Sequence, residues 1–381
     1  MIKNAIVVSA QPAALRARAD ASSGRQRRSF LSVASHTRGW PLRSTIALFT
    51  TMAVVAGPAL IAAACSSPTN NRSAATDPGG HAGAGFRRAQ SATTPDPPPE
   101  RPATIRRLRP PDPVPPAVAA TWLGAPGDGQ WTTAGRSNGT KPAVQITTLR
   151  QGGHLVSAAW VSAAQTRVAL YAGTTQPAGP WSNDGAVPAT LQGSLVAAFN
   201  GGFHLDASRG GWYADGHQAI PLRDGAASLV ISSNGSATVA QWGRDVTLTP
   251  DVIAVRQNLE LLVDTGAPTP LTTAANPIAE WGDPLHENVL TWRSALGVDA
   301  SGDLVYVAGP GLDPQTLASA MVAIGAVRAM ELDINPEWIS FDTFTGDGPA
   351  VTGTKLLSSM YFPTNHFLIP FWRDFVAIFT R

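Results

Sequence analysis

The stretch RSALGVDASGDLVYVAGPGLDPQTLASAMVAIGAVRAMEL, residues 293–332, carries the pattern that decides the fold. Residues 293–298 and 304–308 are short apolar runs, and they flank the turn sequence Asp-Ala-Ser-Gly at residues 299–302. Two such runs around a short turn that contains glycine predict a β-hairpin.

The spacing of the apolar residues changes after this hairpin. Asp313 is a residue type favoured at helix N-caps, and Pro314 suits the first position of a helix. The apolar residues spaced to lie on one face of that helix are Leu317, Met321 and Ile324. Gly325 can end the helix in the left-handed conformation, and residues 326–332 follow as a strand. Strand, helix and strand in this order predict a right-handed crossover connection.

Outside this stretch, short β-rich runs alternate with turn clusters. The first three runs predict an opening meander, and Asn234-Gly235 predicts a tight hairpin because both central residues of a type I′ turn need positive φ. The runs are residues 144–149, 154–162, 167–171, 194–199, 227–232, 238–242, 252–255, 259–263, 338–344 and 375–380. We therefore expect an α+β fold, with mixed β-sheets and a few helices in a single domain over residues 121–381.

The charge is divided unevenly along the 381 residues. Residues 1–120 hold 15 basic and 5 acidic side chains, whereas residues 121–381 hold 13 basic and 21 acidic ones. The expected folded domain is therefore acidic, which argues against a nucleic-acid partner. A single cysteine excludes an intramolecular disulfide framework.

The N-terminal region, residues 1–65, has the features of an export signal or membrane anchor. Residues 44–64 carry no charge and are almost long enough to cross a bilayer as a helix, and seven arginines precede them. Basic flanks stay on the cytoplasmic side, so we expect the rest of the chain to lie outside the cytoplasmic membrane.

Cys65 leaves two forms of tether open. The sequence Ala62-Ala63-Ala64-Cys65 looks like a lipoprotein processing site, in which Cys65 would be acylated. The alternative is an uncleaved signal anchor with Cys65 as an incidental thiol. Both alternatives hold the protein at the membrane through residues 44–65. Residues 66–120 are rich in proline, serine and alanine, and they predict a disordered, semi-rigid linker.

Three segments of the expected domain carry residues suited to chemistry. Residues 200–204, Asn-Gly-Gly-Phe-His, end a strand, and glycines there permit a sharp turn with exposed N–H groups that can hold an anion. Arg293 shares a strand face with Ala295 and Gly297, so a ligand such as phosphate has room above its guanidinium. Taken alone, each also suits a structural role: an ordinary turn and an internal ion pair.

The third segment is the strongest of the three. Glu331 and Asp333 lie on one face of a strand, and Asn335 and Glu337 follow directly after it. Acidic and amide groups at the end of a strand that follows a helical crossover suit a general base, a sugar contact or a metal ligand. The histidine spacing does not predict a zinc site, and no spacing of the EF-hand type supports a calcium site in the acidic loops. We therefore expect no metal or other cofactor.

These three segments, in this order, resemble the phosphodiester glycosidase family. The family pattern is a strand into Asn-Gly-Gly-Phe, an Arg-Thr-Ala-Ile-Gly-like strand, and a helix followed by Ala-x-x-Leu-Asp-Gly-Gly-Gly-Ser. The matching segments here are residues 200–203, 293–297 and 329–333. Residues 214–231 are similar to the Asp-Gly turn and following strand of the family. One departure is clear, because Ile334-Asn335-Pro336-Glu337 stands where the family has Gly-Gly-Gly-Ser.

The resemblance implies hydrolysis of sugar-1-phosphodiester bonds in envelope glycans or glycopolymers. It implies that Arg293 and the Gly201-Gly202 backbone hold phosphate, and that Asp333 or Glu331 acts as base or nucleophile. It also implies that Asn200 orients a sugar hydroxyl and that Phe203 contacts the substrate. Asn335 and Glu337, which stand where the family pattern differs, would build a different ligand contact.

Two alternatives remain. The Ile334-Asn335-Pro336 sequence favours a non-catalytic glycan-binding envelope lipoprotein on the same fold. A structural envelope protein would instead use the late aromatic run as a docking surface. The aromatic residues of that run are Phe367, Phe371, Trp372 and Phe375.

Overall fold

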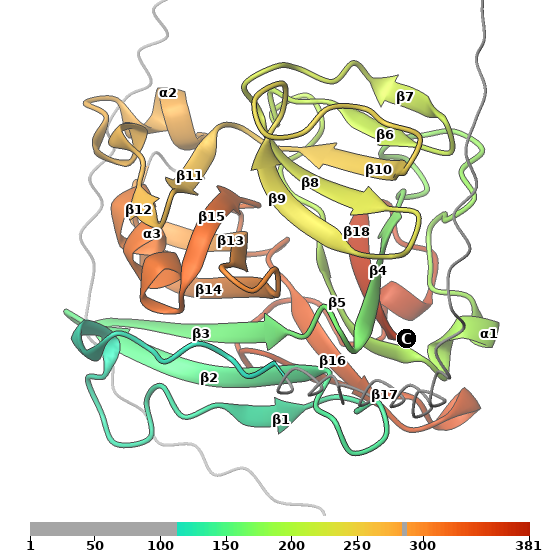
Figure 1. Cartoon of the computed structure of the whole chain (residues 1–381), viewed down its shortest axis with the longest axis horizontal. Helices are drawn as coiled ribbons and strands as arrows, with labels where there is room; N and C mark the ends of the chain where they lie inside the picture. The colour runs from blue at the N-terminus through green and yellow to red at the C-terminus, as the bar shows by residue number, and fades with distance from the viewer. Residues whose placement is uncertain (1–112, 284–287) are drawn as a thin grey trace, which may run out of the picture. The chain divides into compact units, whose positions relative to one another are not determined.

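The structure, a computed structural model, describes residues 113–283 and 288–381. The expected anchor, Cys65 and most of the predicted linker lie outside the described residues. Within the described ranges the chain forms three β-sheets and only three α-helices, which confirms the α+β class (Figure 1). The helices are α1 (Ala189–Gln192), α2 (Pro277–Trp281) and α3 (Pro314–Ala323).

The largest sheet has eight strands and is built around the stretch that predicts the hairpin and the crossover. Its strands, in spatial order, are β1 (Thr132–Ala134), β2 (Val144–Gln151), β3 (His154–Val161), β14 (Leu304–Leu312), β13 (Thr291–Asp299), β15 (Ala326–Glu331), β11 (Leu261–Asp264) and β12 (Ala267–Pro268).

Two five-stranded sheets complete the domain. The second sheet has the order β7 (His217–Ile220), β6 (Trp212–Ala214), β10 (Val252–Gln257), β8 (Ala227–Ser232) and β9 (Ala237–Gln241). The third sheet has the order β17 (Thr352–Lys355), β16 (Phe341–Thr345), β5 (Leu195–Asn200), β18 (Phe375–Thr380) and β4 (Thr166–Tyr171).

Neighbouring strands pair in the antiparallel sense throughout these sheets. The predicted hairpins form as β13 with β14 and as β8 with β9. The turn between β8 and β9 differs from the expected type I′ turn, because Gly235 has positive φ and Asn234 does not. Because β14 and β15 are both antiparallel to β13, they run parallel to one another, and α3 crosses from one to the other. The expected crossover is therefore present, but the three sheets are antiparallel rather than mixed, because every pair of neighbouring strands is antiparallel.

Helix α3 begins and packs as its sequence predicts. The Asp313 side chain accepts a hydrogen bond from the Thr316 backbone N–H, which caps the first turn. Leu317 and Met321 are fully buried, and burial of such a side chain contributes about 1.5–3 kcal/mol. Gly297 on β13 permits the close approach, because a Cβ there would lie 2.6 Å from the Arg328 carbonyl oxygen and 2.7 Å from Met321 Cε.

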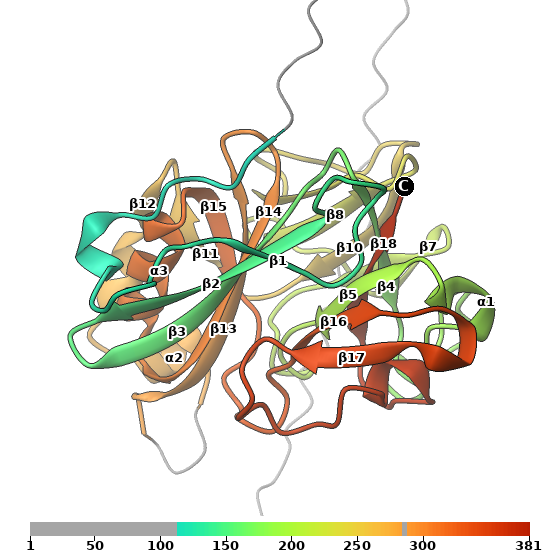
Figure 2. The same cartoon turned by 90° about the horizontal axis from the view of Figure 1, so that it is seen from below.

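The eight-stranded sheet separates two hydrophobic cores. Ala295 on β13 belongs to the core beneath α3, whereas Leu296 and Val298 belong to the core that contacts the other two sheets. Figures 1 and 2 show α3 on one side of this sheet and the two smaller sheets on the other. The alternation expected along β13 is therefore confirmed, and each face of the strand has its own environment.

Two expectations about the start of the domain need correction. Strand β4 leaves the predicted meander and pairs with β18 in the third sheet, because its register matches that strand from Thr166 to Tyr171. The chain also contacts the domain upstream of residue 121. The Ala119 N–H donates to the Ala323 carbonyl at 2.8 Å, and the Pro116 carbonyl accepts from the Trp131 indole at 2.9 Å.

Candidate functional site

The three segments singled out in the sequence meet in one place. Asn200, at the end of β5, donates through Nδ2 to Ser294 Oγ on β13 at 3.3 Å. The Ser294 N–H in turn donates to the carbonyl of Asp333 at 3.0 Å, just after β15. The ends of three strands from two sheets are thus linked by a short series of buried hydrogen bonds.

Asn258 fixes the loop after β5 against the end of β15. Its Oδ1 accepts from the Phe203 N–H at 3.2 Å, and its Nδ2 donates to the carbonyls of Glu331 and Leu332 at 2.6 and 3.0 Å. Asn258 is fully buried, so these bonds satisfy groups that water does not reach. The sequence analysis did not identify this residue, since a lone Asn between two strands carries no motif.

A cavity of about 250 Å³ opens where these segments meet. Its floor and walls combine one carboxylate and one guanidinium from buried residues with aromatic side chains. The lining residues are Phe203, His204, Ala207, Asp283, Asp333, Ile334, Asn335, Trp338 and Arg373. Phe203, Asp333 and Asn335 are thus residues that the sequence predicted and the structure places at a cavity.

Asp333 is buried, and both of its carboxylate oxygens have partners. Oδ1 accepts from the backbone N–H groups of Ile334 and Asn335 at 2.8 and 2.9 Å, and Oδ2 lies 3.1 Å from Arg373 Nη2. Burial raises the pKa of Asp333, while Arg373 and the two N–H groups act in the opposite direction by favouring the charged carboxylate. The turn at residues 334–336 is shaped around this carboxylate.

Arg373 is the cation of this cavity, and sequence analysis did not find it. Its Nη2 also donates to the Gly202 carbonyl at 2.7 Å, and its guanidinium carbon lies 4.8 Å from the centre of the Trp338 ring. Among the described residues, all hydrogen bonds of this guanidinium use Nη2. The signal that could have revealed it is the charged pair Arg373-Asp374 inside an aromatic run directly before the last strand.

Arg293 and Glu331 lie elsewhere, and they form a separate buried ion pair. Arg293 Nη1 is 2.6 Å from Glu331 Oε1, and Nε donates to the Leu312 carbonyl at 2.9 Å. Burial raises the pKa of Glu331 to about 7, against the opposing effect of Arg293. Neither residue lines the cavity, so the structure gives Arg293 the structural role that the sequence had offered as its alternative.

Asn200 and the two glycines do not line this cavity, and with Trp338 and Arg373 they border a separate void of about 10 Å³. Asn200 Oδ1 accepts from the Tyr306 hydroxyl at 3.2 Å and from the Ser340 N–H at 3.3 Å, so its amide joins strands. The Gly201 N–H donates to the Asp374 carbonyl at 3.1 Å and is not available to an anion. The turn at Gly201 and Gly202, which we expected to hold phosphate, instead forms hydrogen bonds with the segment that carries Arg373.

The residues after Asp333 differ in where they lie, because some line the cavity and one is exposed to solvent. Asn335 lines the cavity, and its Oδ1 accepts from the Glu337 N–H at 2.9 Å. Glu337 itself is exposed and does not line the cavity. Ile334 is buried and contributes an apolar wall.

His204 lies on the rim of the cavity with two polar partners. Its Nδ1 is 2.7 Å from Asp206 Oδ1, and the Gln176 amide nitrogen contacts both ring nitrogens. The hydrogen bond with His204 lowers the pKa of Asp206. These groups add polar contacts at the mouth of the cavity without entering its floor.

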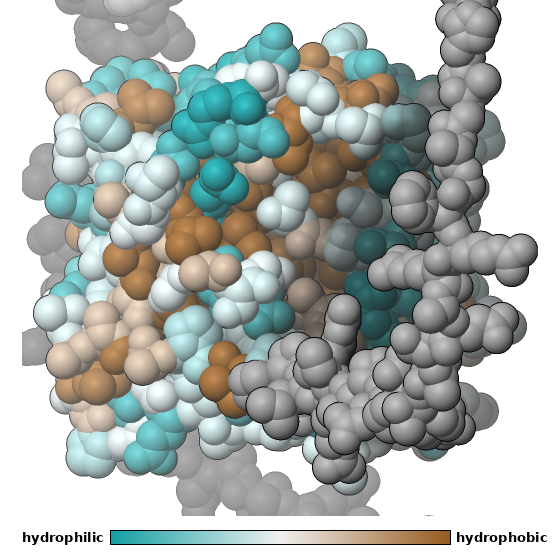
Figure 3. Space-filling model, in the orientation of Figure 1, coloured by the Kyte–Doolittle hydropathy of each residue, from teal (hydrophilic) through white to brown (hydrophobic). Residues whose placement is uncertain are grey.

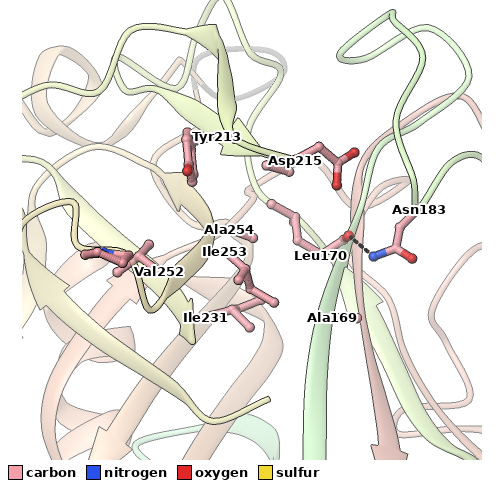
Figure 4. Close-up of a pocket in the computed structure, with 12 residues that line it drawn as sticks. Ala169, Leu170, Asn183, Tyr213, Asp215, Ile231, Val252, Ile253 and Ala254 are labelled. Carbon is pink, nitrogen blue, oxygen red and sulfur yellow. Dashed lines mark hydrogen bonds between the residues drawn. The ribbon is translucent and has the colours of Figure 1, made fainter. Parts of the chain in front are cut away.

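A larger cavity of about 460 Å³ lies between β4 and the second sheet. Figure 3 shows a brown, apolar hollow in this part of the face, and Figure 4 shows its lining. Its one carboxylate, Asp215, accepts from the Ser182 N–H at 2.6 Å, and Asn183 donates to the Leu170 carbonyl at 3.2 Å. Those polar groups hold loops in place, so the smaller cavity is the better candidate for chemistry.

No group of three or more His, Cys, Asp or Glu side chains in the described ranges is arranged to hold a metal ion. Among the helices of the same residues, none has the length and apolar character needed to span a membrane.

Comparison with known proteins gives only distant structural likenesses. No protein-family model and no curated protein matches the sequence. The catalytic domain of zebrafish N-acetylglucosamine-1-phosphodiester alpha-N-acetylglucosaminidase, auto-inhibited by its pro-peptide, is 14% identical, with a TM-score of 0.39 over 66% of this chain and 88% of its own. A hypothetical protein from Synechocystis is 12% identical, with a TM-score of 0.35 over 66% of this chain and 64% of its own. A Burkholderia pseudomallei protein described as exported is 12% identical, with a TM-score of 0.28 over 64% and 75%.

Proposed function

We propose that the domain hydrolyses glycosyl phosphodiesters in the cavity formed around Asp333 and Arg373. The observation that carries this proposal is the buried carboxylate–guanidinium pair at the base of a cavity of about 250 Å³ with aromatic walls. When the bond between the anomeric carbon and the phosphate oxygen breaks, positive charge develops on the carbon and negative charge on the leaving phosphate. A carboxylate and a guanidinium side by side match that separation of charge.

Each residue then has a stated task. Asp333 stabilises the developing positive charge at the anomeric carbon, and Arg373 binds the phosphate through a planar fork suited to two oxygens. Water supplies the oxygen that bonds to the carbon, the electron pair of the broken bond leaves with the phosphomonoester, and the proton of the water passes to solvent. Because a phosphomonoester is stable as an anion, the leaving group needs little help from a general acid.

The test measures product release by the full chain. A panel of sugar-1-phosphodiesters, one of them carrying N-acetylglucosamine, is incubated with wild type and Asp333→Asn, and free sugar and phosphomonoester are measured together. We expect equal release of both by the wild type and a loss of at least roughly a hundredfold in the variant. Asp342→Asn is the control, since Asp342 is also buried but does not line the cavity. Unchanged turnover in Asp333→Asn would refute the proposal.

A second function is favoured by one specific observation. Both oxygens of Asp333 are already hydrogen-bonded, an arrangement that also suits a fixed binding surface. The corresponding function is glycan binding without cleavage. It predicts saturable binding of a phosphodiester-linked glycan with no product, and the same panel distinguishes the two functions.

The proposal also includes the place of action. The uncharged stretch at residues 44–64 and the arginines before it support an extracytoplasmic domain held at the membrane by a signal anchor or by lipid on Cys65. Envelope glycans would then be within its reach. Protease treatment of intact cells tests whether the domain lies outside the cytoplasmic membrane. A Cys65→Ser variant tests the tether, because loss of a lipid on Cys65 would release the protein from the membrane.

A further inference from the structure

A set of aromatic side chains leads from the cavity to the surface. Trp338, which lines the cavity, lies 4.4 Å from Trp372 and 5.5 Å from Phe362, measured between ring centres. Phe362 continues to Phe371 at 5.1 Å and to Tyr361 at 5.3 Å. The late aromatic run noted in the sequence is therefore continuous with the candidate site.

The two ends of this set differ in exposure. Arg373 covers one face of Trp338, so this ring belongs to the cavity wall. Trp372 is 42% exposed and Tyr361 is 63% exposed. Large aromatic residues left in contact with water beside a polar cavity are typical of binding surfaces.

The backbone holds Trp372 in a fixed position even though its ring is exposed. The Trp372 carbonyl accepts from the N–H groups of Thr175 and Gln176 at 3.3 and 3.1 Å, and the adjacent Phe371 carbonyl accepts from Thr174 at 2.9 Å. Gln176 also contacts His204 on the cavity rim. The Trp372 ring is thus presented at the mouth of the cavity by an ordered segment.

We propose that Trp372, which directly precedes Arg373 in the chain, is a subsite for a sugar ring on the leaving-group side of the phosphate. This inference rests on the proposed function and makes Trp372 a specificity-determining residue for the group beyond the phosphate. A sugar presents an apolar face to an aromatic ring and directs its hydroxyls sideways, where polar side chains accept them. Such side chains, Gln176, His204 and Asn335, lie at this mouth, whereas an alkyl chain would require an unbroken apolar groove.

The experiment compares two substrates with the same sugar-1-phosphate. One carries a methyl leaving group and the other an oligosaccharide, and each is tested with wild type, Trp372→Ala and Trp372→Tyr. We expect Trp372→Ala to raise KM for the oligosaccharide substrate roughly three- to tenfold, with kcat and the methyl substrate unchanged and with Trp372→Tyr close to wild type. Leu248→Ala is the control, because Leu248 is 46% exposed and lines neither cavity.

Binding of the same two compounds, measured by calorimetry, separates the subsite from the hydrolysis. Should the wild type release no product, the proposed function fails, yet weaker binding of only the oligosaccharide compound by Trp372→Ala would still establish the subsite. Equal effects on both compounds, or no effect on either, would overturn the subsite.

Discussion

Two arginine–carboxylate pairs lie near the end of β15, and their surroundings differ. Arg293 and Glu331 are 2.6 Å apart and enclosed by the eight-stranded sheet and the loops before it, where backbone carbonyls take further donors of the guanidinium. Arg373 and Asp333 are 3.1 Å apart and line a cavity. The same two chemical groups therefore serve the fold in one place and suit a ligand in the other.

The difference shows that access, rather than residue type, separates a structural pair from a candidate site. An enclosed ion pair loses the hydration of both charges, and its mutual attraction does little more than offset that loss. A pair on a cavity wall can exchange part of its mutual contact for contacts with a charged ligand. Three predictions test the contrast, from the largest expected effect to the smallest.

The largest effect is expected when one partner of the enclosed pair is removed. Arg293→Met leaves Glu331 buried without its cation, and we expect a loss of about 3–5 kcal/mol in the free energy of unfolding. Urea unfolding measures this loss. The double variant Arg293→Met with Glu331→Met should recover most of it, since two apolar side chains of similar length need no hydration.

If Arg293→Met were as stable as wild type, the enclosed pair would not be structural. If the variant kept its stability and lost phosphate binding, the phosphate role that the sequence first suggested for Arg293 would return.

A second prediction concerns an enclosed carboxylate without an arginine. Burial raises the pKa of Asp342 from 3.8 to about 7, with Lys355 acting in the opposite direction, and His366 Nδ1 lies 3.6 Å from Asp342 Oδ2. The unfolded carboxyl loses its proton more readily, so the stability contributed by this group is present below pH 3.8 and is lost as the pH rises through 7.

Asp342→Asn removes that dependence. We expect the free energy of unfolding of the variant, relative to that of wild type, to rise by about 2–4 kcal/mol between pH 4 and pH 8. Thermal or urea unfolding at each pH measures this difference. His366, whose pKa burial lowers to about 4, remains in both proteins, so most of its contribution cancels in the difference. A difference that stays constant with pH would mean that Asp342 is ionised throughout.

Much of the fold follows from local pattern. The cap at Asp313, the helix after it and the hairpin on either side of residues 299–302 form as the sequence predicts, because each depends on residues close in the chain. The partner of β4 was not predictable in the same way. Its choice of β18 depends on two strands about 200 residues apart that match in register and bury their faces together.

The candidate site was predicted in part for the same reason. The cavity is lined by three residues that the sequence analysis singled out, Phe203, Asp333 and Asn335. Arg373 was missed because its neighbour Asp333 is 40 positions earlier in the chain. Arg293 looked free on its strand face because the carbonyls that occupy it, those of Leu312 and Trp281, come from the ends of two other elements, β14 and α2.

The smallest predicted effect concerns how the open pair, Arg373 and Asp333 at the cavity, is held in place. Gly201 packs against the residue after Arg373, because a Cβ at Gly201 would lie 2.6 Å from Asp374 Oδ2 and 2.8 Å from the Asp374 carbonyl oxygen. Asp374 is itself fixed by Arg256, whose Nε donates to the same Oδ2 at 2.6 Å, so the segment cannot move aside freely.

Gly201→Ala should therefore lower the free energy of unfolding by about 1–3 kcal/mol and reduce phosphate affinity as Arg373 shifts. Gly193→Ala is the matched control, since a Cβ there meets nothing within 4 Å and its φ of −63° suits alanine. Equal behaviour of the two variants would mean that the turn after β5 has no part in positioning Arg373, and that the open pair is held by Trp338 and the Gly202 carbonyl alone.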